Sequence, residues 1–161
     1  MKKNYVAYGI IAVALLGVAG FFFMQERKPA LSALEIETSA YMNEAFRAIV
    51  PTWNEEEMIK RQGPYMRTLD ADGQKTAALF ALFRKLGAFE DSKGCEFLEA
   101  YSTFPPSPDN PPPAETANYQ CIAVFEQDTA KVMFILGKEN GAWGIAGLRV
   151  FSPYIEELAK Q

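Results

Sequence analysis

The hydrophobic and polar positions divide this chain into one long apolar run and a longer part in which apolar residues recur periodically. The run, Tyr5 to Met24, has no charged residue in its 20 positions. At about 1.5 Å per residue, a helix of this length reaches roughly 30 Å, the thickness of a bilayer's hydrocarbon core. The run therefore predicts a transmembrane helix within an N-terminal signal-anchor, residues 1–28, with membrane lipid as its partner.

A cleaved signal peptide is the alternative interpretation of the same run. Residues 1–3 supply a positive start in either case, and the tolerable cleavage site would follow Gly20. Residues 21–24 prolong the apolar stretch beyond that site, and this length favours an anchor that is not removed. The two interpretations leave different mature proteins, and the sequence keeps both open.

Helical periodicity governs the first part of the remaining chain. Apolar residues recur there at spacings of three and four, and Gly63-Pro64 and Gly87 are typical of helix ends. The pattern predicts three helices: Leu34 to Ile49, Glu55 to Gln62 with Thr52 or Asn54 as its cap, and Gly73 to Leu86. In the third of these, the apolar face is expected to hold Ala78, Leu79, Leu82, Phe83 and Leu86.

After Gly87 the pattern changes to that of extended strands. Four stretches are rich in aromatic and β-branched residues, and turn signals at Asp128 and Asn140-Gly141 separate the last three. Helices followed by strands indicate an α+β domain with an antiparallel sheet, here placed at residues 29–161. The predicted strands are Phe97 to Phe104, Asn118 to Phe125, Lys131 to Leu136 and Trp143 to Phe151.

The two cysteines, Cys95 and Cys121, lie on either side of a proline-rich tract, Phe104 to Pro113. Pro108 is midway between them, so a hairpin symmetric about that residue brings the cysteines directly opposite each other. An even pair of cysteines beyond a membrane is most simply a disulfide, and two reduced thiols are the alternative. A disulfide would place the domain outside the cytoplasm, in a bacterial periplasm if the source is Gram-negative, and we expect a cytoplasmic N-terminus and a single pass through the inner membrane.

Composition excludes several classes of function. Four of the 16 basic residues and one of the 20 acidic residues lie within residues 1–28, which leaves 12 and 19 and a net charge near −7 for the domain. Such a balance argues against nucleic acid as a partner.

The chain has no histidine, which removes the common general base, the Ser-His-Asp and Cys-His constellations and most zinc sites. Asp70-Ala71-Asp72-Gly73 is expected to be a capped turn before a helix, not a calcium loop. We predict no catalytic, cofactor-binding or metal residue.

A resemblance follows from the order of these elements. The helix ending at Leu86-Gly87, the strand carrying Tyr119 and Phe125, and the stretch Gly141-Ala142-Trp143-Gly144-Ile145-Ala146-Gly147 resemble small periplasmic domains of the nuclear-transport-factor-2-like, or cystatin-like, superfamily over Ser39 to Ser152. The resemblance implies a curved sheet wrapped around the first helix as a cone, with a cavity at its open end. Isomerases of that fold pair a buried acid with tyrosines, and the residues of those types here are Tyr41, Tyr65, Tyr101, Tyr119 and Glu99.

Two functions from different classes are consistent with these patterns. The first is a non-catalytic, membrane-tethered periplasmic binding or accessory module that contacts a protein partner within an inner-membrane complex. The alternative is a small-molecule-binding or weakly catalytic cone protein. A deep apolar pocket with a buried acid would favour the alternative, whereas a filled interior with exposed apolar residues would favour the first. Trp143 is expected to be a packing anchor at the start of a strand.

Overall fold

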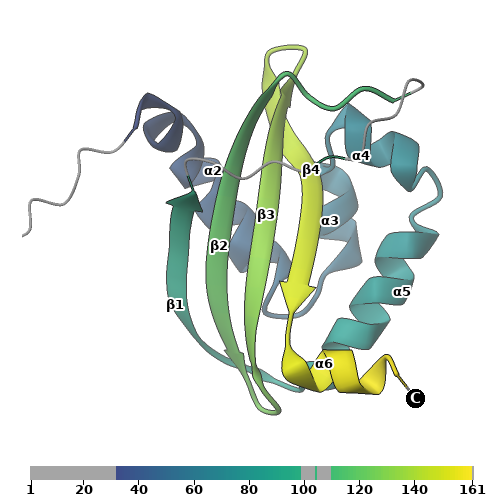
Figure 1. The fold of residues 1–161 in the computed structure, drawn as a ribbon. Coiled ribbons are helices and arrows are strands. Elements are labelled where there is room, and N and C mark those ends of the chain that lie inside the picture. The colour runs from purple at the N-terminus through teal and green to yellow at the C-terminus, as the bar shows by residue number, and fades with distance from the viewer. Residues whose placement is uncertain (1–31, 99–103, 105–109, 161) are drawn as a thin grey trace, which may run out of the picture. The chain divides into compact units, whose positions relative to one another are not determined.

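The computed structural model describes residues 32–98, 104 and 110–160. Its elements follow the α+β order predicted from the sequence, helices first and an antiparallel sheet second (Figure 1). They are α2 (Ala33–Ile49), α3 (Glu55–Arg61), α4 (Pro64–Leu69), α5 (Gln74–Phe83), a 3-10 turn η1 (Arg84–Leu86), β1 (Phe89–Leu98), β2 (Glu115–Phe125), β3 (Thr129–Glu139), β4 (Ala142–Phe151) and α6 (Pro153–Leu158).

Helix α2 confirms the first predicted helix almost to the residue. Ser32 is its N-cap, and the Ser32 hydroxyl accepts a hydrogen bond from the Glu35 N–H at 3.1 Å. The helix ends at Ile49, directly before Val50-Pro51, because proline cannot continue the ladder of hydrogen bonds. One face of the helix is buried, at Thr38, Met42, Ala45, Phe46 and Ile49.

The sheet has the strand order β1-β2-β3-β4, and every neighbouring pair is antiparallel. Cys95 lies opposite Cys121 and Leu98 opposite Asn118, so the β1–β2 register is the one centred on residue 108. Asn140 and Gly141, with φ of 53° and 79°, form the turn between β3 and β4, as their sequence predicted. The sheet therefore keeps the register that the cysteine spacing indicated.

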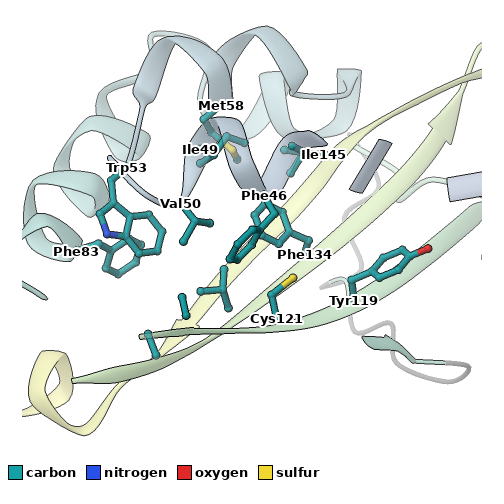
Figure 2. Close-up of a cluster of buried hydrophobic side chains, with 14 of the residues drawn as sticks. Phe46, Ile49, Val50, Trp53, Met58, Phe83, Tyr119, Cys121, Phe134 and Ile145 are labelled. Carbon is teal, nitrogen blue, oxygen red and sulfur yellow. The ribbon is translucent and has the colours of Figure 1, made fainter. Parts of the chain in front are cut away.

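Alternate residues of the sheet point toward α2 and build the core with it. On β2 the core residues of this face are Ala117, Tyr119, Cys121, Ala123 and Phe125. Phe46 and Ile49 from α2 meet Phe134 and Ile145 from β3 and β4 in the centre of the cluster (Figure 2). The interior between helix and sheet is therefore filled by side chains.

Within the same core, aromatic side chains surround Trp53, which follows α2. Its ring stacks on Phe125 at 5.7 Å between centroids and lies 4.9 Å from Phe83. Phe80 packs against the same ring at 5.6 Å. Since aromatic side chains bury large apolar areas, this cluster fixes α5 to the sheet.

The structure corrects the predicted apolar face of the third helix. Leu79, expected inside, is 48% exposed, whereas Phe80 is 1% exposed. Phe80 and Phe83 turn inward because they contact Trp53, and that orientation directs Leu79 to solvent. The helix itself ends at Phe83, and η1 carries the chain on to Gly87, whose φ of 84° suits glycine.

Two helices and most of strand β1 were missed by the periodicity. Gly63-Pro64 was interpreted only as a break, yet Pro64 begins α4, because proline suits the first position of a helix. Ser152-Pro153 opens α6 in the same way. Strand β1 starts at Phe89 and not at Phe97, and residues 99–103 of the predicted strand lie outside the described residues.

Within the described ranges, no helix combines the length and the apolar character that a membrane crossing requires. The predicted span Tyr5 to Met24 lies outside those ranges.

Candidate functional site

The predicted disulfide between Cys95 and Cys121 is present. It joins the edge strand β1 to β2 at directly opposite positions, with a Cα–Cα distance of 4.0 Å. Cys121 is fully buried within the core cluster (Figure 2). The bond closes a loop between positions 26 apart in sequence and so restricts the unfolded chain. A disulfide is consistent with an oxidising compartment.

Tyr119 points its hydroxyl at Thr38 of α2, and the two oxygens lie 2.7 Å apart. The Thr38 hydroxyl donates to the Leu34 carbonyl at 2.8 Å, so an arrangement in which Tyr119 donates to Thr38 satisfies both groups. Burial raises the pKa of Tyr119, although the hydrogen bond with Thr38 acts in the opposite direction. This phenol therefore links the first helix to the sheet.

Tyr65 is also buried, and its neighbours come from distant parts of the chain. Its ring lies edge-on to Phe104 at 4.9 Å, and the Asn110 side chain donates to its carbonyl at 3.3 Å. Its backbone N–H donates to both carboxylate oxygens of Glu139, at 3.1 and 3.2 Å. Glu139 thus caps α4 from the β3–β4 hairpin. Two other residues considered from sequence, Glu99 and Tyr101, lie outside the described residues.

Asp70 confirms the expected capped turn. Its carboxylate is 5% exposed and accepts hydrogen bonds from the Lys75 N–H at 2.9 Å, the Thr76 N–H at 2.8 Å and the Thr76 hydroxyl at 2.6 Å. Burial raises the pKa of Asp70, but these hydrogen bonds, together with the charge of Lys75, outweigh it and hold the pKa below its ordinary value. The buried Asp70 carboxylate is therefore engaged in hydrogen bonds at the start of α5.

A further group of polar side chains lies around a surface cleft of about 500 Å³ between α2, α3, α4 and the β3–β4 hairpin. Tyr41 and Glu44 come from α2, Lys60 and Arg61 from α3, and the hairpin adds Glu139 and Trp143. The Tyr41 hydroxyl donates to the Arg61 carbonyl at 3.2 Å, and burial raises the pKa of this phenol. We call this the first cleft.

Arg61 holds one wall of the first cleft in place. Its guanidinium pairs with Glu44 at 2.9 Å and with Glu57 on its own helix, and only 11% of its side chain is exposed. Paired in this way, Arg61 connects α3 with α2. Its charge is already balanced by two carboxylates, so it acts as a structural element of the wall.

Trp143 forms the opposite wall. Its indole N–H donates to Glu37 Oε1 at 2.9 Å, and Lys138 Nζ lies 2.8 Å from the same oxygen and 5.3 Å from the centre of the indole ring. The hydrogen bond from Lys138 lowers the pKa of Glu37, and that bond raises the pKa of Lys138. Trp143 is a packing residue at the start of β4, as expected, and one edge of its ring also lines the cleft.

Backbone forms the floor of the first cleft. The Gly63 N–H donates to the Ile145 carbonyl at 2.9 Å, and Gln62 pairs with Ile145 as a parallel bridge. A side-chain carbon placed on Gly144 would lie 2.8 Å from the Gly63 Cα. Only glycine at position 144 permits this approach. The sequence signal for it was the Gly-x-Trp-x-Ile-x-Gly stretch, but its partner at Gly63 is distant in sequence.

A second cleft of about 620 Å³ is lined by residues from the end of α3 to the turn before α5. It shares Lys60, Gln62 and Arg67 with the first cleft. Ile59, 44% exposed, and Ala71 give it an apolar part, and Asp72 lies at its border. Periodicity had placed none of these residues in a site, because each belongs to a different turn or helix end.

No protein-family model, curated protein or solved structure matches the chain. The resemblance to nuclear-transport-factor-2-like domains therefore stays a prediction. In the part of the chain that the structure describes, no three Cys, Asp or Glu side chains converge as ligands for a metal ion.

Proposed function

We propose that the protein is a non-catalytic, membrane-tethered periplasmic module that binds a protein partner, as a subunit of an inner-membrane complex. In this proposal residues 1–28 are the uncleaved anchor with a cytoplasmic N-terminus, and residues 29–161 form a periplasmic domain with a cone-like sheet. The length of the apolar run supports the anchor. The Cys95–Cys121 bond supports the oxidising compartment.

The observation that carries the proposal is the filled interior between α2 and the sheet. Core side chains from both layers occupy the space where a cone-fold enzyme would hold its substrate. Two buried polar groups of the kinds that such chemistry would use, Asp70 and Tyr119, are hydrogen-bonded within the fold. The features left for recognition are open clefts and exposed apolar side chains, and these suit contact with another macromolecule.

The alternative, a small-molecule-binding or weakly catalytic protein, requires a deep apolar pocket that contains an available acid. In the first cleft both oxygens of Glu139 accept from the Tyr65 N–H, and Glu44 is paired with Arg61. Neither carboxylate is buried in an apolar surrounding. The geometry of the described residues thus favours the binding module.

Fractionation of cells that express the full-length chain tests this proposal. We expect the protein to remain with the membrane after an alkaline wash, to be extracted by mild detergent, and to migrate on native gels at a mass above that of the chain alone. Thiol labelling with and without reductant, in intact cells, reports the compartment. Recovery of a freely soluble monomer with both thiols reactive would contradict the proposal.

A further inference from the structure

We propose that the face of the sheet turned away from α2 binds the same face of a second copy of the chain and so forms a symmetric dimer. We call this surface the front face. The inference goes beyond the proposed function and rests on it for one point only, the membrane anchor, which limits how two copies can be related. The row of front-face residues across the middle of the sheet is Glu96, Gln120, Met133 and Arg149.

The strands are apolar on both sides, although helices cover only one. Figure 1 shows α2 crossing behind the sheet, and no helix of the described ranges crosses the front. An antiparallel sheet with one solvated face alternates apolar and polar residues, whereas strands covered on both faces read as continuous apolar runs. Strand β3 is apolar without interruption from Val132 to Leu136, and β2 from Ile122 to Phe125. This pattern indicates a sheet with two covered faces.

One end of the front face is occupied by the chain itself. A side-chain carbon placed on Gly137 would lie 2.5 Å from Pro113 Cγ and 3.1 Å from Ala146 Cβ, so Pro113 covers that end. The middle and the other end carry apolar side chains that do not belong to the core between α2 and the sheet. Of these, Met133 is 7% exposed and Phe151 is 41% exposed. The complete set is Ile122, Val124, Met133 and Phe151. An apolar patch of this kind within polar surroundings is typical of a protein interface.

The row through Met133 carries opposite charges at its two ends. Glu96 lies at the β1 end and Arg149 at the β4 end. When two such faces pack about a two-fold axis parallel to the strands, β1 of one copy lies over β4 of the other. Glu96 then faces the Arg149 position of the second copy, and the symmetry repeats this contact. Opposite charges arranged in this way favour self-pairing over other partners and other orientations.

The next row is complementary in size under the same axis. It begins at Gly94 on β1, passes through Ile122 and Lys131, and ends at Phe151 on β4. A side-chain carbon placed on Gly94 would meet no atom of the described residues within 4 Å, so the space above this glycine is open. The Phe151 ring of one copy can therefore lie over Gly94 of the other. A large side chain at one end of the row matches a missing side chain at the other.

The anchor selects this axis among the possible ones. Tyr119 bonds to Thr38, and Lys138 bonds to Glu37, so the first turns of α2 lie at the end of the sheet where β2 begins and β3 ends. An axis parallel to the strands places both starts of α2 at the same end of the dimer, and both anchors can then enter one membrane. An axis across the strands would place them at opposite ends. Sheets that pack face to face keep their strand directions within about 30°, which is compatible with this pairing of rows.

Charge reversal in the full-length protein tests the central row. Light scattering in detergent measures the mass of the protein component, and we expect twice the mass of one chain. Glu96→Arg should raise the dissociation constant about tenfold or more, because like charges then face each other at two places. The double variant Glu96→Arg/Arg149→Glu places opposite charges over each other again and should recover the dimer.

The matched control is Glu56→Arg, which makes the same change of charge at an exposed position on α3. This variant should dimerise like the unchanged protein, and circular dichroism checks that each variant is folded. Equal weakening by Glu56→Arg would overturn the proposal, because net charge would then explain the effect. A double variant that stays as weak as Glu96→Arg would also overturn it, since the two positions would not face each other.

Photo-cross-linking in membranes locates the contact and separates this inference from the proposed function. A photoreactive residue at Phe151 should link to β1 of a second, differently tagged copy, near Gly94. Leu79 on α5, 48% exposed against 41% for Phe151, is the matched control and should give no link between copies. Links from Phe151 only to a different protein would overturn the dimer and leave the proposed function standing. Links from Phe151 to β1 in a chain recovered without membrane would support the dimer and contradict the proposed function.

Discussion

The two tryptophans of the chain lie in opposite kinds of surroundings. Trp53 is 1% exposed and stacks on Phe125, and its indole N–H has no hydrogen-bond partner among the residues that the structure describes. Trp143 is half-buried, and its N–H donates to Glu37 at the rim of a cleft. The first residue contributes apolar area to the core, whereas the second fixes the position of a polar wall. The same side chain thus serves stability in one region and surface geometry in the other.

Removing Trp53 should have the largest effect on stability. Trp53→Ala takes away the ring that Phe80, Phe83 and Phe125 contact, and large-to-small changes of this kind cost about 3–5 kcal/mol. Urea unfolding of the full-length protein in detergent, followed by circular dichroism, measures the loss. Trp143→Ala is the matched control and should cost clearly less. Equal losses would mean that both tryptophans belong to one core.

Reduction of the disulfide should have the next largest effect. Because the Cys95–Cys121 bond restricts the unfolded chain, its loss is expected to lower the free energy of unfolding by about 2–4 kcal/mol. The comparison is unfolding with and without reductant. The same reductant should leave the unfolding of a Cys95→Ala/Cys121→Ala variant unchanged. A shift in that variant would assign the effect to something other than the bond.

Replacing Asp70 should have a smaller effect that depends on pH. Because its pKa is lower in the folded state, ionised Asp70 stabilises the fold above its ordinary pKa of 3.8, and this contribution is lost as pH falls through the lower folded value. Asp70→Asn should therefore lower the free energy of unfolding by about 1–3 kcal/mol near neutral pH, and its difference from the unchanged protein should narrow as pH falls below 3.8. Asp72→Asn, at the exposed neighbour, is the control. If the stability difference between Asp70→Asn and the unchanged protein did not vary with pH, this role of the Asp70 charge would be contradicted.

Glu37→Gln should have the smallest effect on unfolding. The Glu37 carboxylate accepts hydrogen bonds from Trp143 and Lys138 on the surface, where water competes for the same groups. We expect an unfolding midpoint close to that of the unchanged protein, measured in urea as above. A loss comparable to that of Trp53→Ala would place the Trp143 wall inside the core and remove the distinction between the two regions.

Local sequence was sufficient for the parts of the fold that local rules govern. Apolar spacing located α2, and the symmetric position of the cysteines about Pro108 gave the β1–β2 register. The β3–β4 turn followed from Asn140-Gly141. In each case the residues that decide the structure are close in sequence or related by a simple count.

The candidate site could not be predicted in this way, because contacts between distant residues build it. Glu139 caps Tyr65 across 74 positions, and Gly63 meets Gly144 although neither sequence neighbourhood indicates the other. Helix α4, which lies between these contacts, was missed since Pro64 is typical of a break as well as of a helix start. The prediction that Leu79 faces the core failed for a similar reason, because Trp53, which Phe80 contacts instead, lies on another element.

The backbone contact at Gly63 also limits how the sheet can grow. An outer strand with free N–H and C=O groups invites pairing with another molecule, a common beginning of aggregation. On β4, the Ile145 carbonyl already accepts from the α3–α4 junction, and on β1 the register is interrupted around Gly94. Both outer strands are thus poor templates for further strands, so edge-to-edge pairing between copies of the chain is disfavoured.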